Sequence, residues 1–317
     1  MRSGVGAVLS VNALALALFA FPADATECGG ALSTCIDDDV LWPHAGPAHF
    51  VAVGSAETTG AGHLGFGLVT SYLSRPIVLE SPSPGPGRGT SYNAVDDQVN
   101  SSFLWSYGMT RDLELDFALP LTLGQGGTGL APVTGGGGLK DTAARDLRFG
   151  VAYAILAHDH LALDSAPLRA WGLVARFEMS APTGDHSQFA GEHSGVFAPG
   201  LSGDYRLGPI FVGAEVGARV RPTAQLLDAR IGSQFVGALG IGYDILPREL
   251  LAVALEAWAL PTYVTPAEWQ LSLRSSPLEA GDLSLQLGGG GGIPLGGDLP
   301  LTTPRFRFTL GVRWAPL

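Results

Sequence analysis

The chain has 317 residues, of which 46% are hydrophobic but only 15% are charged, well below the quarter that is usual for soluble globular proteins. Its formal net charge is −11, and Lys140 is its single lysine. This balance argues against nucleic acid as a partner, because phosphate binding needs clustered Lys and Arg.

The first 25 residues have the three parts of an export signal in the expected order. Arg2 supplies a positive start, residues 5–21 form an apolar core, and Ala23-Asp24-Ala25 forms a small-residue cleavage site. The apolar core is a little short for a full membrane span and lacks flanking stop-transfer charges. We therefore expect residues 1–25 to be removed as a signal peptide.

The next segment, residues 26–62, begins with the only two cysteines of the chain, Cys28 and Cys35. Their spacing in an exported chain favours a disulfide that closes a small loop. The stretch CGGALSTC offers no ligands at metal-binding spacing, so we expect no metal there and no cofactor. The acids 37–39 lack the Gly and Glu of a calcium loop and are interpreted as a solvated turn. Whether this segment lies in the periplasm or inside a barrel lumen stays open.

After residue 62 the pattern is alternation of apolar and polar residues over about ten positions, interrupted by turn residues. In LELDFALPLTL (113–123), for example, Leu and Phe share one face while Glu114, Asp116 and Thr122 share the other. No apolar run reaches the 18 residues of a transmembrane helix. Twelve strands are predicted, near residues 64–73, 97–109, 113–123, 146–156, 168–181, 196–207, 209–221, 232–245, 250–261, 267–276, 281–291 and 304–315.

The connections between these strands alternate in length. Short ones include TRD (110–112) and GP (208–209), whereas Gly- and Pro-rich loops such as 74–96 and 124–145 are long. An even number of strands with short turns at one end and long loops at the other is typical of bacterial outer-membrane barrels. The sequence therefore predicts that residues 63–317 form an all-β, transmembrane, antiparallel barrel with up-and-down meander topology.

The final stretch, PRFRFTLGVRWAPL (304–317), interleaves large apolar residues with arginines. In a closed membrane barrel the apolar face contacts lipid and the charged face points inward, while the backbone groups pair within the sheet. Aromatic residues near the strand ends, such as Trp105, Tyr153 and Trp171, suit interfacial girdles. We therefore expect the bacterial outer membrane as the location and its lipid as a partner.

Several stretches resemble a known family. They are YLSRPIVL (72–79), YGMTRDLELDFALPL (107–121), MSAPTGD (179–185) with GE (191–192), and LSGDYRLG (201–208). From about residue 48 onward the chain resembles the barrel module of OmpA-like outer-membrane proteins, in the variety with about a dozen strands. It is similar at a greater distance to outer-membrane transporters of phenol-degradation and hydrophobic-uptake families.

Two departures limit what this resemblance implies. OmpA-like proteins usually carry a peptidoglycan-binding domain after the barrel, and here the sequence stops three residues after Trp314, so peptidoglycan anchoring is not implied. Signals for the barrel-assembly machinery usually end on an aromatic residue, whereas Ala315, Pro316 and Leu317 follow the tryptophan. We still expect that machinery to act on the C-terminal strand.

The inward face of the predicted barrel carries nearly balanced charge. The acids are Glu114, Asp116, Glu178, Asp204, Glu215, Asp244, Glu256 and Glu268, and the bases are Arg148, Arg176, Arg206, Arg219, Arg221, Arg274, Arg305, Arg307 and Arg313. Such residues tune the passage of ions when a pore is open. They close a narrow lumen when they pair with one another, because buried charges usually persist only as pairs. The sequence leaves both arrangements open.

Signals for an enzyme are weak. Asp185, His186, Glu192 and His193 share the predicted loop 184–195, but neither a metalloprotease helix motif nor a serine-nucleophile elbow occurs. HDH (158–160) falls in a predicted turn, and both stretches are interpreted as hydrated surface. The glycine run 288–292 lacks the context of a phosphate loop and is interpreted as a place where a strand bends or meets a bulky neighbour.

The predicted function is a passive channel or transporter for small solutes, and not an enzyme. Two alternatives stay open: a non-conducting structural barrel, and an outer-membrane enzyme with a site in its extracellular loops.

Overall fold

The structure, a computed structural model, describes residues 28, 30–80, 89–156, 169–246, 250–276, 283–295 and 297–316. The predicted signal peptide, the stretch HDH and two of the predicted turns (246–249 in most of its length and 277–280) lie outside the described residues. Among the described residues, no helix has the length and apolar character needed to cross a membrane.

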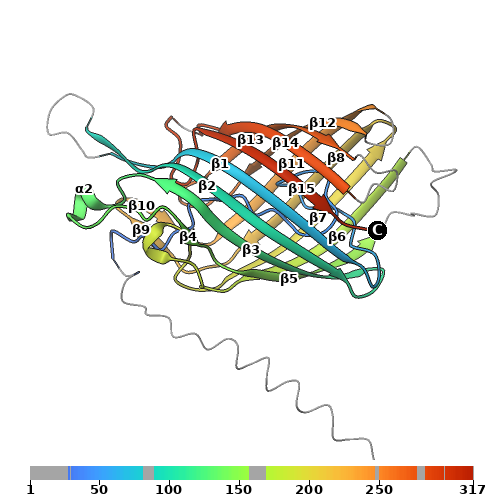
Figure 1. The fold of residues 1–317 in the computed structure, drawn as a ribbon, viewed down its shortest axis with the longest axis horizontal. Coiled ribbons are helices and arrows are strands. Elements are labelled where there is room, and N and C mark those ends of the chain that lie inside the picture. The colour runs from blue at the N-terminus through green and yellow to red at the C-terminus, as the bar shows by residue number, and fades with distance from the viewer. Residues whose placement is uncertain are drawn as a thin grey trace, which may run out of the picture.

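Long antiparallel strands dominate the described chain (Figure 1). They form a thirteen-stranded sheet in which β4 contributes only two residues, so that twelve long strands make the wall. The long strands are β1 (Leu64–Glu80), β2 (Ser91–Gly108), β3 (Leu113–Gly126), β5 (Arg148–Leu156), β6 (Arg169–Ser180), β7 (Val196–Leu207), β8 (Ile210–Arg219), β11 (Gln234–Leu246), β12 (Leu251–Ala259), β13 (Ala267–Ser275), β14 (Leu283–Gly292) and β15 (Phe306–Trp314). The short elements are α2 (Ala131–Thr134), β4 (Ala143–Ala144), η2 (His186–Gln188), β9 (Ala224–Leu226) and β10 (Ala229–Ile231).

The sheet closes on itself. Strand β1 pairs with β2 along one edge and with β15 along the other, and its partners on β15 run from Trp314 opposite Phe66 to Phe306 opposite Ser74. The other long strands pair with their neighbours in chain order. Because closure leaves no unpaired edge in the wall, every wall strand satisfies its backbone within the sheet, as a membrane interior requires. The predicted fold class, a closed antiparallel meander of about twelve strands, is confirmed.

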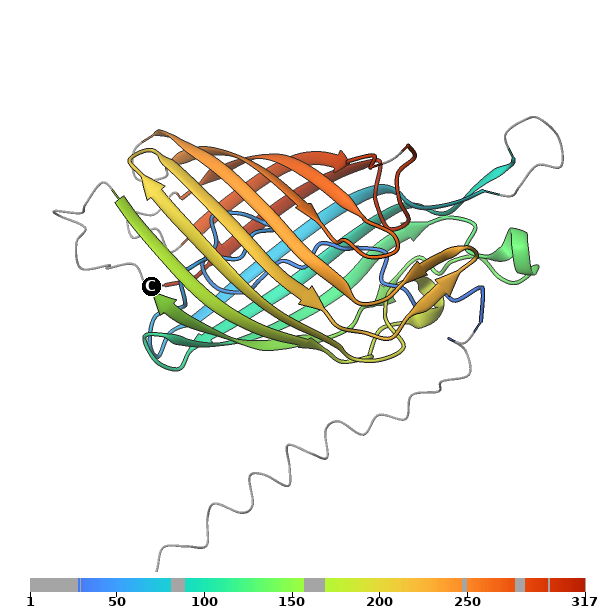
Figure 2. The same ribbon diagram turned by 180° about the vertical axis from the view of Figure 1, so that it is seen from behind.

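The two ends of the barrel differ. The turn between β2 and β3 and the C-terminus lie at one end, here named the turn end (Figure 1). The opposite end, here named the loop end, carries α2, β4 and the β9–β10 hairpin (Figures 1 and 2). The predicted loop 222–231 therefore contains a small hairpin of its own, whose strands pair from Ala224–Ile231 to Leu226–Ala229.

Strands β1 and β2 are longer than the alternation predicts. The predicted loop 74–96 is shorter in the structure, because both strands continue past the wall as a hairpin. A bulge separates the two parts, with Arg75 at φ 52° and a register shift between Ser74 and Ile77. Ile77 and Val95 of this extension are buried, so the extra strand length is held by packing at the loop end.

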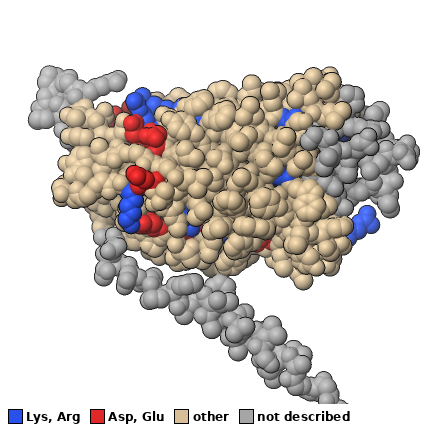
Figure 3. All heavy atoms as spheres, in the orientation of Figure 1, with Lys and Arg blue, Asp and Glu red and all other residues tan. Residues whose placement is uncertain are grey.

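The outer face of the wall is apolar. Along β15 the burial pattern alternates strictly, with Phe308 and Leu310 exposed while Arg307 and Thr309 between them are buried. The middle of the barrel surface is almost free of charged atoms, which gather toward the loop end on the face drawn in Figure 3. Aromatic residues and leucines exposed in this way are stable in contact with lipid and unfavourable in water.

A charge placed on this outer face tests the assignment of lipid to the outside. Leu239 lies in the middle of β11 and is 67% exposed, whereas Phe235 lies on the same face one residue from the start of that strand, at its loop end. We expect Leu239→Arg to lower the free energy of unfolding by about 2–4 kcal/mol, and Phe235→Arg by about 0–1 kcal/mol, because the cost of a charge falls toward the interface. Urea unfolding in lipid vesicles, followed by gel migration without boiling, measures both. Equal small effects at the two positions would contradict a lipid-facing wall.

Candidate functional site

The lumen of the barrel is filled by residues 30–62, here named the plug, which pass inside the wall from the loop end to the turn end (Figure 2). Isolated bridges mark its course: Leu32 pairs with Leu226 of β9, and Ala61 pairs with Gly108 at the end of β2. The described plug contains no helix and no ladder of its own. Its polar backbone therefore needs partners from the wall, and the inward-facing charges supply many of them.

At the loop end the three consecutive acids of the plug are held by arginines. Asp37 and Asp38 both form ion pairs with Arg145, at 3.1 Å for Asp38. Asp39 accepts a bond of 2.9 Å from Arg307, which also binds Glu268 of β13 at 2.7 Å. The prediction of a solvated turn at residues 37–39 is wrong, because Asp38 and Asp39 are buried and compensated by wall charges.

Farther into the barrel, the indole ring of Trp42 contacts two arginines. The guanidinium carbon of Arg219 is 4.2 Å from the centre of the indole ring, and that of Arg148 is 4.9 Å from it. Each cation is attracted to the indole by the ring quadrupole, and the attraction grows when the cations are desolvated. This arrangement attaches the plug to β5 and β8 together.

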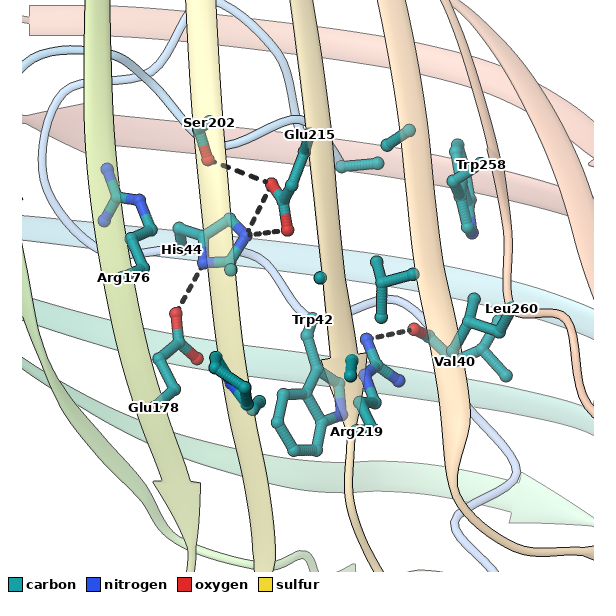
Figure 4. Close-up of a pocket in the computed structure, with 18 of the residues that line it drawn as sticks. Val40, Trp42, His44, Arg176, Glu178, Ser202, Glu215, Arg219, Trp258 and Leu260 are labelled. Carbon is teal, nitrogen blue, oxygen red and sulfur yellow. Dashed lines mark hydrogen bonds and ion pairs between the residues drawn. The ribbon is translucent and has the colours of Figure 1, made fainter.

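His44 bridges two carboxylates of the wall (Figure 4). Its Nδ1 lies 2.5 Å from Glu178 of β6, and its Nε2 lies 3.1 Å from Glu215 of β8. Because these contacts use both ring nitrogens, the bridge is strongest when the imidazole carries two protons and donates from each.

The next part of the plug is bound through its backbone. Glu256 of β12 accepts hydrogen bonds from the N–H groups of Val51 and Ala52, and Glu215 accepts one of 2.6 Å from Gly54. The residues Asp204 and Glu114 accept further backbone bonds nearer the turn end. Wall guanidiniums meet the carbonyls: Arg219 donates to Val40, Arg148 to Pro43 and Arg176 to Ser55.

One large side chain of the plug fits a gap in the wall that glycines leave open. The ring of Phe50 lies against Gly240 of β11 and Gly213 of β8, where an ideal Cβ would be 2.5 Å and 2.7 Å from ring carbons. Phe211 packs beside it with ring centres 5.4 Å apart. Any residue larger than glycine at these two positions would collide with this ring.

Little space remains beside the plug. A cavity of about 40 Å³ lies between Trp42, His44 and the wall strands β6, β7, β8, β11 and β12 (Figure 4), and a second of about 20 Å³ lies near Arg145 and Arg148. A single water needs roughly 10–15 Å³ of such volume. These cavities hold a few waters and are too small for a solute, so the described plug and wall residues close the lumen in this state.

The structure puts most of the predicted inward charges where the alternation placed them. Twelve are buried in the lumen: Glu114, Asp116, Arg148, Arg176, Glu178, Glu215, Arg219, Glu256, Glu268, Arg274, Arg307 and Arg313. Asp204, Arg206 and Asp244 are partly buried toward the turn end, where Arg206 and Asp244 form an ion pair of 2.6 Å. Arg221 forms an ion pair with Glu192 at the loop end.

Arg305 is the exception and corrects the predicted set. It is exposed, it precedes the first residue of β15, and its N–H donates to the carbonyl of Ser74. The prediction extended the alternation of β15 two residues too far toward the loop end. Arg305 therefore does not line the lumen.

The loop that carries the histidines is part of the packing at the loop end. Asp185 accepts a 3.0 Å bond from Lys140, which lowers the pKa of that carboxyl against the opposing effect of partial burial. Asp146, in the connection between β4 and β5, accepts bonds from the N–H groups of Gly184 and Glu192, both at 2.8 Å. Burial nevertheless raises the pKa of Asp146 to about 7.

Cys28 and Cys35 form a disulfide at the loop end, with Cα atoms 5.5 Å apart. The side chain of His186 approaches it, so that one donor atom of each of these residues lies within 4.8 Å of the others. Both sulfurs are used by the disulfide, and we assign no metal to this group.

Sequence reasoning missed the plug residues that hold the lumen closed, chiefly Asp38, Asp39, Trp42 and His44. A signal was present in IDDDVLWPHAGPAHF (36–50), where acids, an aromatic and histidines lie among prolines without any strand period. Such a segment must find its partners in tertiary contacts, because it makes no regular structure of its own.

No family model matches the chain, and no curated protein matches it. Among solved structures it is similar to an outer membrane channel from Pseudomonas putida F1, at 17% identity and a TM-score of 0.54, over 82% of this chain and 98% of that one. The NanC porin (9% identity, TM-score 0.46, 80% and 99% covered) and the KdgM porin (8%, 0.43, 78% and 98%) are similar to it at TM-scores below 0.5. The chain therefore has the fold of an outer-membrane channel barrel.

Proposed function

We propose that the protein is a passive channel for small solutes in the bacterial outer membrane, and that the plug holds it closed in the state described. The observation that carries this proposal is that the plug fills the lumen but is not a strand of the wall. The wall strands form ladders only with other strands of the same sheet, and the plug adds one bridge to them, between Ala61 and Gly108 at the turn end. The sheet would therefore keep nearly all of its backbone bonds if the plug moved away. Movement of the plug would uncover a lumen lined by carboxylates and guanidiniums.

The cell context follows from the same features. The predicted signal peptide would send the chain out of the cytoplasm, and the barrel-assembly machinery would insert it through its C-terminal strand. The apolar outer face would then contact outer-membrane lipid. We also propose, from the short motifs in the sequence, that the chain is related to the barrel module of OmpA-like proteins or to transporters of hydrophobic-uptake families.

One observation favours the second candidate, a structural barrel without conductance. Several buried charges of the lumen are paired, for instance Arg307 with Glu268 and Asp39, and buried pairs of this kind are costly to separate. A permanently closed lumen would leave the protein with a mechanical role in the envelope. We propose no enzyme activity, since the histidine loop is engaged in packing at the loop end.

Conductance in planar bilayers separates channel from structural barrel. Replacing Asp38 and Asp39 by asparagine removes the charges that pair with Arg145 and Arg307. We expect this double variant to show current steps at least about tenfold more often than the unaltered protein, because each charge-assisted bond lost weakens the closed state by about 1.5–3 kcal/mol.

The matched control is Asp141→Asn, which makes the same chemical change on an exposed loop residue. It is expected to conduct like the unaltered protein. If both the double variant and the unaltered protein remain silent while migrating as folded barrels, the channel proposal fails and the structural barrel is favoured.

A further inference from the structure

Between residues 51 and 59 the wall binds the plug mainly through its backbone. From residue 51 to residue 59, carboxylates of four different wall strands accept hydrogen bonds from five backbone N–H groups of the plug. The donors are Val51, Ala52, Gly54, Ala56 and Thr59, at distances between 2.5 and 3.2 Å. Three wall arginines donate to backbone carbonyls of the plug: Arg176 to Ser55 within this stretch, and Arg219 and Arg148 to Val40 and Pro43 before it.

Backbone recognition has a physical cause in a closed barrel. The N–H and C=O groups of the wall strands are already hydrogen-bonded to neighbouring strands, so a peptide in the lumen cannot join the sheet as a further strand. Its buried backbone groups must instead be satisfied by side chains, and carboxylates and guanidiniums make the strongest such bonds. N–H and C=O groups are common to all peptides, so these wall positions would serve another peptide as well as the plug.

Apart from Gly54, the residues of this stretch place few requirements on sequence. At Gly54 an ideal Cβ would lie 2.4 Å from the hydroxyl oxygen of Ser202 and 2.9 Å from a carboxylate oxygen of Glu215, so any side chain there would displace these wall groups. Val51, Ala52, Val53 and Ala56 are small or medium apolar residues, all packed in the lumen. Just before this stretch, Phe50 occupies the gap that Gly213 and Gly240 leave open, and His49 packs against Phe211 and accepts a bond from Arg274. A flexible peptide with one aromatic residue, small residues after it and a glycine at the position of Gly54 would make the same contacts with the wall.

We propose that the lumen is a binding site for flexible oligopeptides, of which the plug is the resident occupant. The inference rests on the proposed channel function and names its substrate class: short, unstructured peptides that replace the plug on Glu256, Glu215, Asp204 and Glu114. Solutes without a peptide backbone, such as sugars, would lack the matching row of donors.

Binding is tested with the full-length protein in detergent, carrying Trp42→Ala and His44→Ala to weaken attachment of the plug at positions outside the backbone-binding stretch. The probe is a fluorescent peptide of residues 48–59, AHFVAVGSAETT, followed by anisotropy. A second peptide carries N-methyl groups at the positions of Val51, Ala52, Gly54 and Ala56. A third carries one N-methyl group at the position of Ser55, between two of these donors.

We expect the unmodified peptide to bind and the Ser55-methylated peptide to bind within a few-fold of it. The peptide methylated at four positions should bind at least about a hundredfold more weakly, because several charge-assisted bonds are lost. Glu256→Gln and Glu215→Gln in the wall should each weaken the unmodified peptide by about tenfold. A scrambled peptide that keeps the phenylalanine and the glycine at their positions should bind comparably to the unmodified one.

The proposal is overturned if the unmodified peptide does not bind, or if four-fold N-methylation leaves binding unchanged. Should the Trp42 and His44 variant fail to migrate as a folded barrel, the Asp38→Asn, Asp39→Asn variant provides the same weakened plug from the loop end. Anisotropy does not depend on conductance. If the protein binds the peptide but shows no current in bilayers, the channel function is refuted while the peptide-binding site stands. Conductance without peptide binding would sink only this inference.

Discussion

Replacing Arg307 by methionine is expected to lower the free energy of unfolding by about 3–5 kcal/mol, because the change leaves two buried carboxylates without their counter-charge. Arg307 is fully buried, and its guanidinium binds Glu268 of β13 and Asp39 of the plug. Loss of the pair therefore weakens both the wall and the attachment of the plug. Urea unfolding in detergent micelles, followed by gel migration without boiling, measures the change.

The matched control lies on the same strand and the same face. Arg313 is 5% exposed, and within the described chain neither of its terminal nitrogens has a hydrogen-bond partner. Arg313→Met removes a buried charge whose desolvation is poorly compensated, so we expect a loss of less than about 1 kcal/mol or a small gain. Equal losses at positions 307 and 313 would show that the Arg307 ion pairs do not stabilise the barrel as described.

Replacing Phe50 by alanine is expected to cost about 3–5 kcal/mol, the range for emptying a buried aromatic site. Its ring is 2% exposed and fills the gap left by Gly213 and Gly240. Gly240→Leu should also destabilise the protein, by about 1–3 kcal/mol, because the new side chain would collide with the ring.

The double variant decides whether the two positions share one space. A leucine at position 240 would fill part of the volume that Phe50→Ala empties, so we expect the double variant to be more stable than the sum of the two single losses implies, by at least about 1 kcal/mol. The same urea titration measures all three proteins. Simple additivity would mean that the phenylalanine ring lies elsewhere in the folded protein.

The wall of this barrel could be derived from local patterns. Strand β3 was predicted at 113–123 and spans Leu113–Gly126, and β15 was predicted at 304–315 and spans Phe306–Trp314. Alternation works here because each wall residue faces one of two solvents, lipid or lumen, and neighbouring residues face opposite ones. The pattern fails only at its ends, as with Arg305, where the strand stops while the alternation of residue types continues.

The extension of β1 and β2 and the β9–β10 hairpin needed more than local information. Ile77, Val95, Leu226 and Ile231 pack with Ile36 of the plug and Phe189 in one apolar cluster over the loop end. No short window of sequence shows that these residues meet, because they come from four separate parts of the chain. These residues are buried only when the loops pack together at the loop end. The β1–β2 extension and the β9–β10 hairpin therefore form strands because of tertiary packing.

By itself, the sequence determined that the chain is a closed barrel with an apolar outside and a charged inside, since a period of two is enough to assign faces in a sheet. Only the tertiary structure decided that the inside is occupied. The plug sequence has no regular alternation of apolar and polar residues. The role of its acids, its tryptophan and its backbone is visible only from their contacts with Arg145, Arg307, Arg219 and Glu256. Charges that would line an open pore bind the plug instead. A hydrogen bond between a buried charge and a buried backbone group offsets the cost of removing both from water.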